Sequence, residues 1–202
     1  MTVPVVALGE RYVVGYNPMK FKELLNLASA ARWEAEPAEM FSAVDHLLVA
    51  LQTAVLQIPQ DKLSFKSPDR DRDLQNFSVH IAHRVQRGLD AARDLTFIAD
   101  TKAMHDTAAQ PYDTPAKIAD YAAGVQQRLR SWRSSEGDAP LNQVVDAYMG
   151  QVTLLQLFEM ITNHTAHHLR QLYAFMQQLG ISPKDPLAVE RLRGVTVLDS
   201  VF

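Results

Sequence analysis

The sequence predicts a mainly α-helical protein, a four-helix bundle with a small N-terminal β-β-α appendage. From Pro37 onward, apolar residues recur at spacings of three and four in four stretches long enough to be separate helices. The first residues differ, because short β-branched runs on either side of Gly9-Glu10 indicate a hairpin, and a short helix follows from Asn17. We therefore expect two units, over residues 1–30 and 37–202.

Start and stop signals place the helices of the bundle. The expected spans are residues 37–58, 73–98, 114–134 and 140–178. Thr114 and Pro115 are typical of an N-cap and a first helical residue, and Gly180 is typical of a C-terminal cap. The last helix is long for a globular protein, and Gly150 is the expected place for a bend. The apolar tail from Pro183 to the end is expected to wrap the bundle.

Composition and charge exclude several classes of protein. The formal net charge of −3 lacks the basic character of a nucleic-acid binder. The chain has no cysteine, which excludes disulfides, thiolate metal sites and a cysteine nucleophile. Its most apolar stretch, from Phe41 to Ile58, is interrupted by polar residues and predicts a buried helix, not a membrane span. With no signal-peptide pattern at the N-terminus, a cytoplasmic location is expected.

Two histidines stand where the apolar stripe of the last helix calls for leucine. Between Ile161 and Leu172, the inward positions of the 3.6-residue period are His164 and His168. Imidazoles four residues apart on one helical face can both bind one ion at about 2.0–2.1 Å. His167 points about a quarter of a turn away from this pair and is a poorer candidate.

A third ligand is expected from a neighbouring helix. His80 lies at the edge of the inner stripe of the second helix, whereas His83 projects nearly opposite that stripe, so we choose His80. His46 is the fallback, and Gln171 is interpreted as a surface amide. The alternative is that these histidines are hydrogen-bonded core residues, although two buried neutral imidazoles then need several partners.

At this point the sequence resembles a known family, the DinB-like metal-binding helical bundles. The stretch Asn163-His-Thr-Ala-His-His-Leu-Arg-Gln-Leu, followed by Gly180-Ile181, is similar to the C-terminal metal motif of that family. The histidines that match the family's His-x-x-x-His pair are His164 and His168. The third ligand of the family lies in a His-Ile or His-Leu pair, which His80-Ile81 matches.

Further stretches resemble a subgroup in which the bundle follows a glutaredoxin-like domain. These are Ala147-Tyr-Met-Gly-Gln-Val-Thr-Leu and Leu192-Arg-Gly-Val-Thr-Val-Leu-Asp-Ser-Val, and residues 2–18 are similar to the second half of a glutaredoxin. The first half of that domain, with its redox cysteine motif, has no counterpart here. Either Met1 is an internal start of a longer protein or the redox half has been lost, and glutaredoxin chemistry is excluded in both cases.

The resemblance implies a metal-dependent thiol-S-transferase that acts on glutathione or a similar low-molecular-weight thiol and an electrophilic substrate. Zinc, nickel, manganese and iron all accept imidazole, so the ligand type does not select the metal. The resemblance also implies a homodimer.

Two other functions stay open. One is a metal-dependent hydrolase, for which Asp45 and Glu159 are the nearest candidates for a general base and Ser78 is a candidate nucleophile whose base is not identified. The other is a non-catalytic interaction module with a structural metal. An open site binds azide or imidazole, whereas a closed structural site does not.

Overall fold

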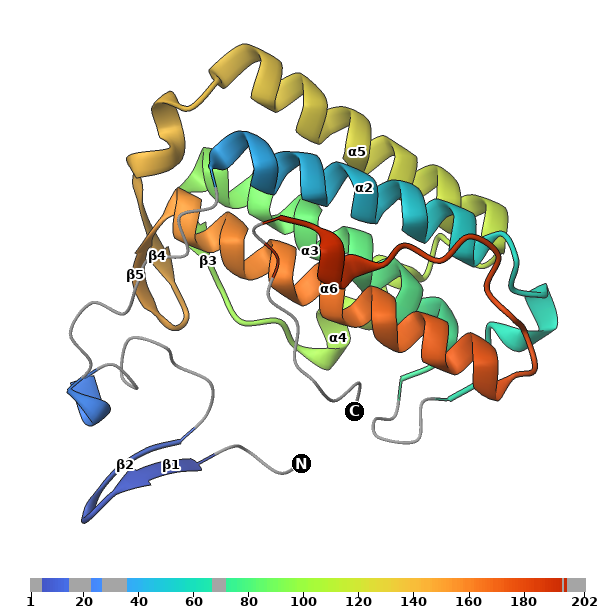
Figure 1. The fold of residues 1–202 in the computed structure, drawn as a ribbon, viewed down its shortest axis with the longest axis horizontal. Helices are drawn as coiled ribbons and strands as arrows, with labels where there is room; N and C mark the ends of the chain where they lie inside the picture. The colour runs from blue at the N-terminus through green and yellow to red at the C-terminus, as the bar shows by residue number, and fades with distance from the viewer. Residues whose placement is uncertain (1–4, 15–22, 27–35, 67–71, 194, 196–202) are drawn as a thin grey trace.

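The structure, a computed structural model, describes residues 5–14, 23–26, 36–66, 72–193 and 195. Four long helices form the bundle that the sequence predicts: α2 (Pro37–Val55), α3 (Leu74–Asp94), α5 (Pro115–Glu136) and α6 (Leu154–Gln178). Helix α2 packs against α5 and α6, and α3 packs against the same two helices (Figure 1). The prediction of a mainly α-helical four-helix bundle is therefore confirmed.

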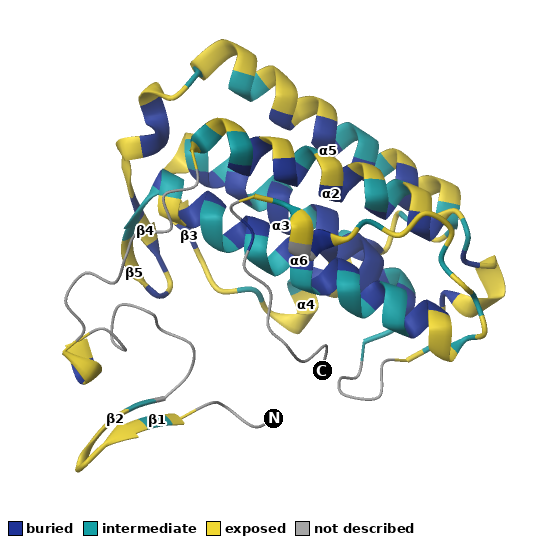
Figure 2. Ribbon diagram, viewed as in Figure 1, coloured by how far each residue is buried: buried dark blue, intermediate teal, exposed yellow. Residues whose placement is uncertain are grey.

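The bundle is held by a single core of apolar side chains. Each long helix turns a buried face inward and an exposed face outward (Figure 2). Leu47, Ile81, Ile118 and Phe158 are among the side chains with no exposed surface, and they come from the four different helices. Burying one such side chain stabilises the fold by about 1.5–3 kcal/mol. This core fixes the rotation of α3 and α6 about their axes, and thus which of their residues face each other.

The ends of the helices follow the signals in the sequence. Thr114 caps α5 by accepting from the backbone N–H of Lys117, and Pro115 occupies the first turn. Asp73 caps α3 by accepting from the N–H of Asn76. Helix α3 ends at Asp94, earlier than predicted, because Leu95 adopts a left-handed conformation with φ of 53°.

The expected fourth helix is shorter than predicted. Residues 140–178 were expected to be helical, but β4 (Val144–Ala147) and β5 (Gly150–Thr153) form an antiparallel hairpin before α6. Gly150 adopts a φ of 112°, which favours a reversal of the chain over a bend in a helix. Thr153 and Gln156 then form a capping box that begins α6.

Other short elements around this hairpin were not predicted either. A 3-10 turn, η2 (Ala139–Asn142), precedes the hairpin, and β3 (Thr96–Phe97) adds to β4 in parallel. Helix α4 (Lys102–Ala109) follows β3 and packs on α3. Thr101 caps α4 by accepting from the N–H of Met104. This small sheet and α4 shape the surroundings of the middle of α3.

The N-terminal hairpin is confirmed, with β1 (Val5–Leu8) and β2 (Arg11–Val14) paired in antiparallel register. Gly9 in its turn has a φ of 61°. The short helix expected from Asn17 lies mostly outside the described residues, which show one helical turn over 23–26. The division into residues 1–30 and 37–202 therefore remains a prediction.

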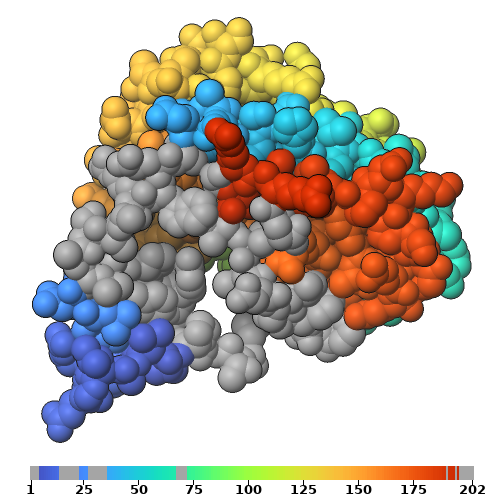
Figure 3. Space-filling model, viewed as in Figure 1, coloured from blue at the N-terminus to red at the C-terminus, as the bar shows by residue number. Residues whose placement is uncertain are grey.

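The segment after α6 lies along the bundle, as expected. The backbone N–H of Lys184 donates to Gln57, in the turn that follows α2, and that of Leu187 donates to the Tyr173 hydroxyl of α6. In the space-filling view this segment, coloured red, crosses the surface beside α2 (Figure 3). This segment includes the 3-10 turn η3 (Val189–Arg191). A further 3-10 turn, η1 (Gln60–Lys62), follows α2. The rest of the predicted tail, from 196, lies outside the described residues.

In the described part of the chain, every helix is too short or too polar to cross a membrane.

Candidate metal centre

The three histidines that the sequence singles out lie together between two helices. Helix α3 supplies His80, and α6 supplies His164 and His168 from successive turns. One nitrogen from each of the three rings lies within 4.8 Å of the other two. His80 and His168 are buried, with exposed fractions of 5% and 4%, whereas His164 is half-buried. The cluster is therefore enclosed on the sides of His80 and His168 and closer to solvent at His164.

The separations of the rings fit a single ion. The centroids of His164 and His168 lie 4.1 Å apart, and His80 lies 5.1 Å from His164 and 5.3 Å from His168. Three imidazoles that bind one ion through nitrogens at about 2.0–2.1 Å, at angles of roughly 90–110°, place their centroids about 4.5–5.3 Å apart. Two separations fall in this range and the third is slightly shorter. The three rings need little movement to hold a divalent metal.

Burial keeps His80 in the form that binds metals. Desolvation lowers the pKa of His80 well below 6.5, and the neighbouring His164 and His168 lower it further. A neutral imidazole has a lone pair to offer to an ion. Its buried Nδ1 makes no hydrogen bond within the described residues. A polar atom in that state is costly in a core that serves only for packing, which favours a ligand role for the ring.

His168 is held on two sides. Its Nδ1 lies 2.5 Å from the side-chain oxygen Oε1 of Gln171, one turn further along α6. The ring of Phe77 from α3 meets that of His168 nearly edge-on, with centroids 5.2 Å apart. The interpretation of Gln171 as a surface amide is therefore wrong. The signal that identifies it is its position three residues after His168, which allows contact on the same helical face.

A fourth histidine, which the helical pattern does not single out, lies beside His80. His105 projects from α4, is 8% exposed, and its ring centroid is 4.4 Å from that of His80. Desolvation lowers its pKa from 6.5 to about 4, with a further contribution from Arg72. Because α4 has only eight residues, its apolar pattern was too short to be predicted as a helix.

His105 and His80 form a second group of possible donors with Asp100. The Asp100 carboxylate, however, already faces two guanidinium groups. One oxygen accepts from Arg84 at 2.8 Å, and the other contacts Arg87. The two arginines also stack on the ring of Phe97. A divalent ion at Asp100 would lie next to both positive charges, so the three-histidine group is the better metal site.

The other candidates lie apart from this cluster. His83 forms a hydrogen bond of 2.9 Å with the Tyr121 hydroxyl, in agreement with its predicted direction away from the pair on α6. His46 is exposed on α2, and Asp45 binds Arg130 through both oxygens. Ser78 is fully buried, and its hydroxyl has no hydrogen-bond partner among the described residues.

Two further candidates from the sequence lie on α6. Glu159 is half-buried there, outside both groups of possible donors. His167 is half-buried too, and its ring lies 6.0 Å from that of His168.

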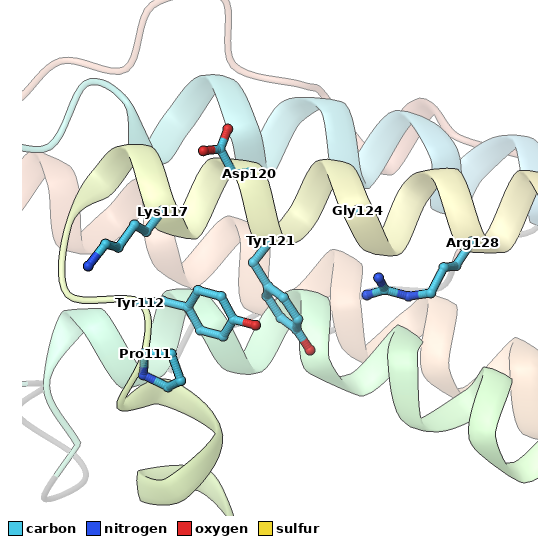
Figure 4. A pocket seen from close by; sticks show the side chains of 7 residues that line it. All are labelled: Pro111, Tyr112, Lys117, Asp120, Tyr121, Gly124 and Arg128. Atoms are coloured by element: carbon cyan, nitrogen blue, oxygen red, sulfur yellow. The ribbon is translucent and has the colours of Figure 1, made fainter.

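A shallow hollow of about 350 Å³ is lined by residues of α5 and of the segment just before it. Figure 4 shows Tyr112 and Tyr121 at its centre, with Lys117 and Arg128 on either side. Both cations are engaged, Lys117 with Asp113 at 2.7 Å and Arg128 with Gln86 at 2.6 Å. This hollow therefore offers a ligand neither an unpaired cation nor a histidine, and the three-histidine cluster is the candidate functional site.

Comparisons with known proteins agree with this fold. Residues 17–172 match the model of the DinB superfamily. A DinB-like protein from Bacillus cereus ATCC 10987 has a similar crystal structure, with a TM-score of 0.58 and 19% sequence identity over 72% of this chain and 93% of that one. No protein of curated function matches this sequence significantly. Since the family match spans most of the chain, including all three histidines of the cluster, this protein belongs to the DinB superfamily.

Proposed function

We propose that the protein is a metal-dependent enzyme that activates a low-molecular-weight thiol, such as glutathione, for transfer to an electrophilic substrate. The observation that carries this proposal is the composition of the donor group. Three imidazoles face one another, and no carboxylate from the described residues belongs to that group. Three neutral ligands leave the full charge of a divalent ion uncompensated and leave coordination positions open.

A bound divalent ion lowers the pKa of a thiol or water that it binds and so supplies a nucleophile near neutral pH. The side chains of this protein set the conditions for that chemistry. His80 and His168 enclose the site within the core, and the half-buried His164 leaves one side closer to solvent. Arg72 adds positive charge near His80 and His105. Such surroundings favour an anionic ligand, such as a thiolate, over a cationic one.

The hydrolase has less support. Many metal-dependent hydrolases use a general base beside the ion, but Asp100, the carboxylate that lies near His80, is bound by Arg84 and Arg87. A closed structural site has less support too, because the donor group contains three ligands where structural zinc sites use four. The homodimer, the cytoplasmic location and the glutaredoxin-like character of the first residues remain expectations from the sequence.

The test is a thiol-transfer assay on protein loaded separately with zinc, nickel, manganese or iron. Glutathione and an aromatic halide serve as thiol and electrophile, and thiol consumption is followed with time. We expect activity with at least one metal and a loss of 100-fold or more in His168→Ala. His83→Ala is the matched control, since that histidine binds Tyr121 outside the donor group. Equal rates in loaded and metal-free protein would refute the proposal.

Azide binding tests the non-catalytic alternative on the same samples. A cobalt-substituted site with open positions changes its visible spectrum when azide is added, whereas a site closed by four protein ligands does not. We expect the change in wild-type protein and in His83→Ala. Stoichiometric cobalt with an unchanged spectrum would favour a structural metal.

A further inference from the structure

The hydrogen bond between His168 and Gln171 has a direction that the chemistry of the two groups fixes. The amide oxygen Oε1 can only accept, so the proton of the 2.5 Å contact belongs to Nδ1 of His168. A neutral imidazole carries one N–H. With that proton on Nδ1, the lone pair is on Nε2.

We propose that Gln171 is a positioning residue that sets the tautomer and the ring orientation of His168, so that Nε2 is the atom presented to the metal. The inference rests on the proposed metal centre for its purpose, but the tautomer is a property of the metal-free protein as well. Metal-binding histidines commonly donate their second N–H to an acceptor, which orients the ring and raises the basicity of the ligand nitrogen.

The ring has few other ways to turn. His168 is 4% exposed, and Phe77 packs against it nearly edge-on, so rotation about the side chain would displace an aromatic ring that itself packs against Phe175. Packing alone does not choose between the two tautomers, because Nδ1–H and Nε2–H imidazoles have the same shape. The hydrogen bond to Gln171 makes that choice.

His80, the other buried histidine of the cluster, differs from His168 in the hydrogen bonding of its Nδ1. The Nδ1 of His80 is buried and makes no hydrogen bond within the described residues. Its tautomer is therefore not set by an acceptor in the described structure. Of these two buried histidines, His168 is the one whose tautomer is set by a hydrogen bond in the metal-free protein.

The choice of an amide over a carboxylate has a chemical consequence. A carboxylate acceptor would add a negative charge beside the ligand and make His168 a stronger electron donor. The neutral Gln171 orients the ring without that added charge. A neutral acceptor at this position would therefore leave an ion held by His168 more of its ability to lower the pKa of a bound thiol or water.

The first measurement uses metal-free protein. Nitrogen-15 NMR of the imidazole rings at about pH 8, where ordinary histidines are neutral, distinguishes Nδ1–H from Nε2–H. We expect Nδ1–H at His168 in the wild type, and a shift towards Nε2–H in Gln171→Leu, which keeps the bulk and removes the acceptor. Gln178→Leu, at the exposed end of the same helix, is the matched control and should leave the His168 signals unchanged.

The second measurement is metal affinity, by competition with a chelator of known strength. We expect Gln171→Leu to bind zinc 10–100-fold more weakly. We expect Gln171→Glu to bind at least as tightly as the wild type, which a purely packing role would not produce. Gln178→Leu and Gln178→Glu control for the general effect of each substitution on α6.

The outcomes separate this inference from the proposed function. An unchanged tautomer and unchanged zinc affinity in Gln171→Leu would overturn the role of Gln171 while leaving the metal centre intact. The opposite result, an Nδ1–H tautomer in the wild type that is lost in Gln171→Leu, in a protein that binds no stoichiometric metal, would refute the metal-dependent enzyme and confirm that Gln171 sets the tautomer.

Discussion

The imidazole rings of His164 and His168 lie 4.1 Å apart between centroids and meet at 81°, one turn apart on α6. Both rings are carried by a single rigid element, so their separation is set by the helix itself and hardly by the tertiary fold. The position of His80 across the helix interface completes the group. The candidate metal site thus depends on one long-range contact, that between α3 and α6.

A metal that binds the folded form should stabilise it. At a free zinc concentration 100 times the dissociation constant, the free energy of unfolding rises by about 2.7 kcal/mol, which raises the Tm of a chain of this size by roughly 5–10 °C. We expect this shift in the wild type and its loss in His164→Ala, as measured by calorimetry. Metal analysis should find one ion per chain in the wild type and in His105→Ala. His46→Ala, at an exposed position on α2, should behave as the wild type in both measurements.

The Asp100 carboxylate should be important for stability because it compensates two buried cations. The side chains of Arg84 and Arg87 are only 7% and 11% exposed. Removing one partner from a buried ion pair costs about 3–5 kcal/mol, since the remaining charge is left uncompensated. We expect Asp100→Asn to lower the free energy of unfolding by that amount in urea denaturation. Asp94→Asn, whose pair with Arg93 is exposed, should leave the unfolding midpoint unchanged.

The metal-free protein should lose stability as the pH falls below about 6.5. Burial lowers the pKa of His105 to about 4 and that of His80 well below 6.5, so the unfolded chain binds protons in this window that the folded chain does not. The stabilising contribution of these neutral rings is complete above pH 6.5 and is lost progressively as the pH falls towards 4. Urea denaturation at several pH values measures the slope. His105→Gln should give a shallower slope, and parallel curves for the two proteins would contradict this account.

Two helical glycines should respond in opposite ways to alanine. A Cβ at Gly88 would lie 2.7 Å from Cδ1 of Ile161 and 3.0 Å from Cε1 of Phe158, where α3 approaches α6. Both side chains are fully buried, so we expect Gly88→Ala to lower the free energy of unfolding by about 1–2 kcal/mol, despite its better helix propensity.

At Gly124 on α5, the nearest atom is the end of Arg128 at 3.4 Å, and Gly124→Ala should raise the free energy of unfolding by about 0.5–1 kcal/mol. Chemical denaturation of both variants provides the comparison. Adding Ile161→Val to Gly88→Ala removes the clashing methyl group and should recover part of the loss. Stabilisation by both alanines would show that α3 and α6 are not closely packed at Gly88.

Periodicity was sufficient to predict the bundle and the histidine cluster. The helical phase separates His80 from His83, and it separates the pair His164 and His168 from His167, because one face of each helix must be apolar. The structure brings the three predicted residues together. That part of the site was predictable because it depends on the rotation of each helix, which the apolar stripe determines.

Other parts of the site follow from contacts that no local pattern encodes. His105 lies near His80 because the short α4 folds back on α3, and Asp100 pairs with arginines that lie on α3. The β4–β5 hairpin has alternating apolar residues, as in Val145 and Ala147. The strong helical pattern of α6 follows soon after them, and the predicted helix therefore included the hairpin residues. Short strands and short helices give too few repeats to distinguish one period from the other.

Metal binding by the histidines of α3 and α6 would give this chain a reversible cross-link. His80 and His164 are more than eighty residues apart in the sequence, so an unfolded chain rarely brings them within reach of one ion. In a protein with no cysteine, an ion held between these helices would link distant segments as a disulfide does, but it could be withdrawn by a chelator or replaced by another metal. The fraction of folded chains then depends on how much free metal surrounds them.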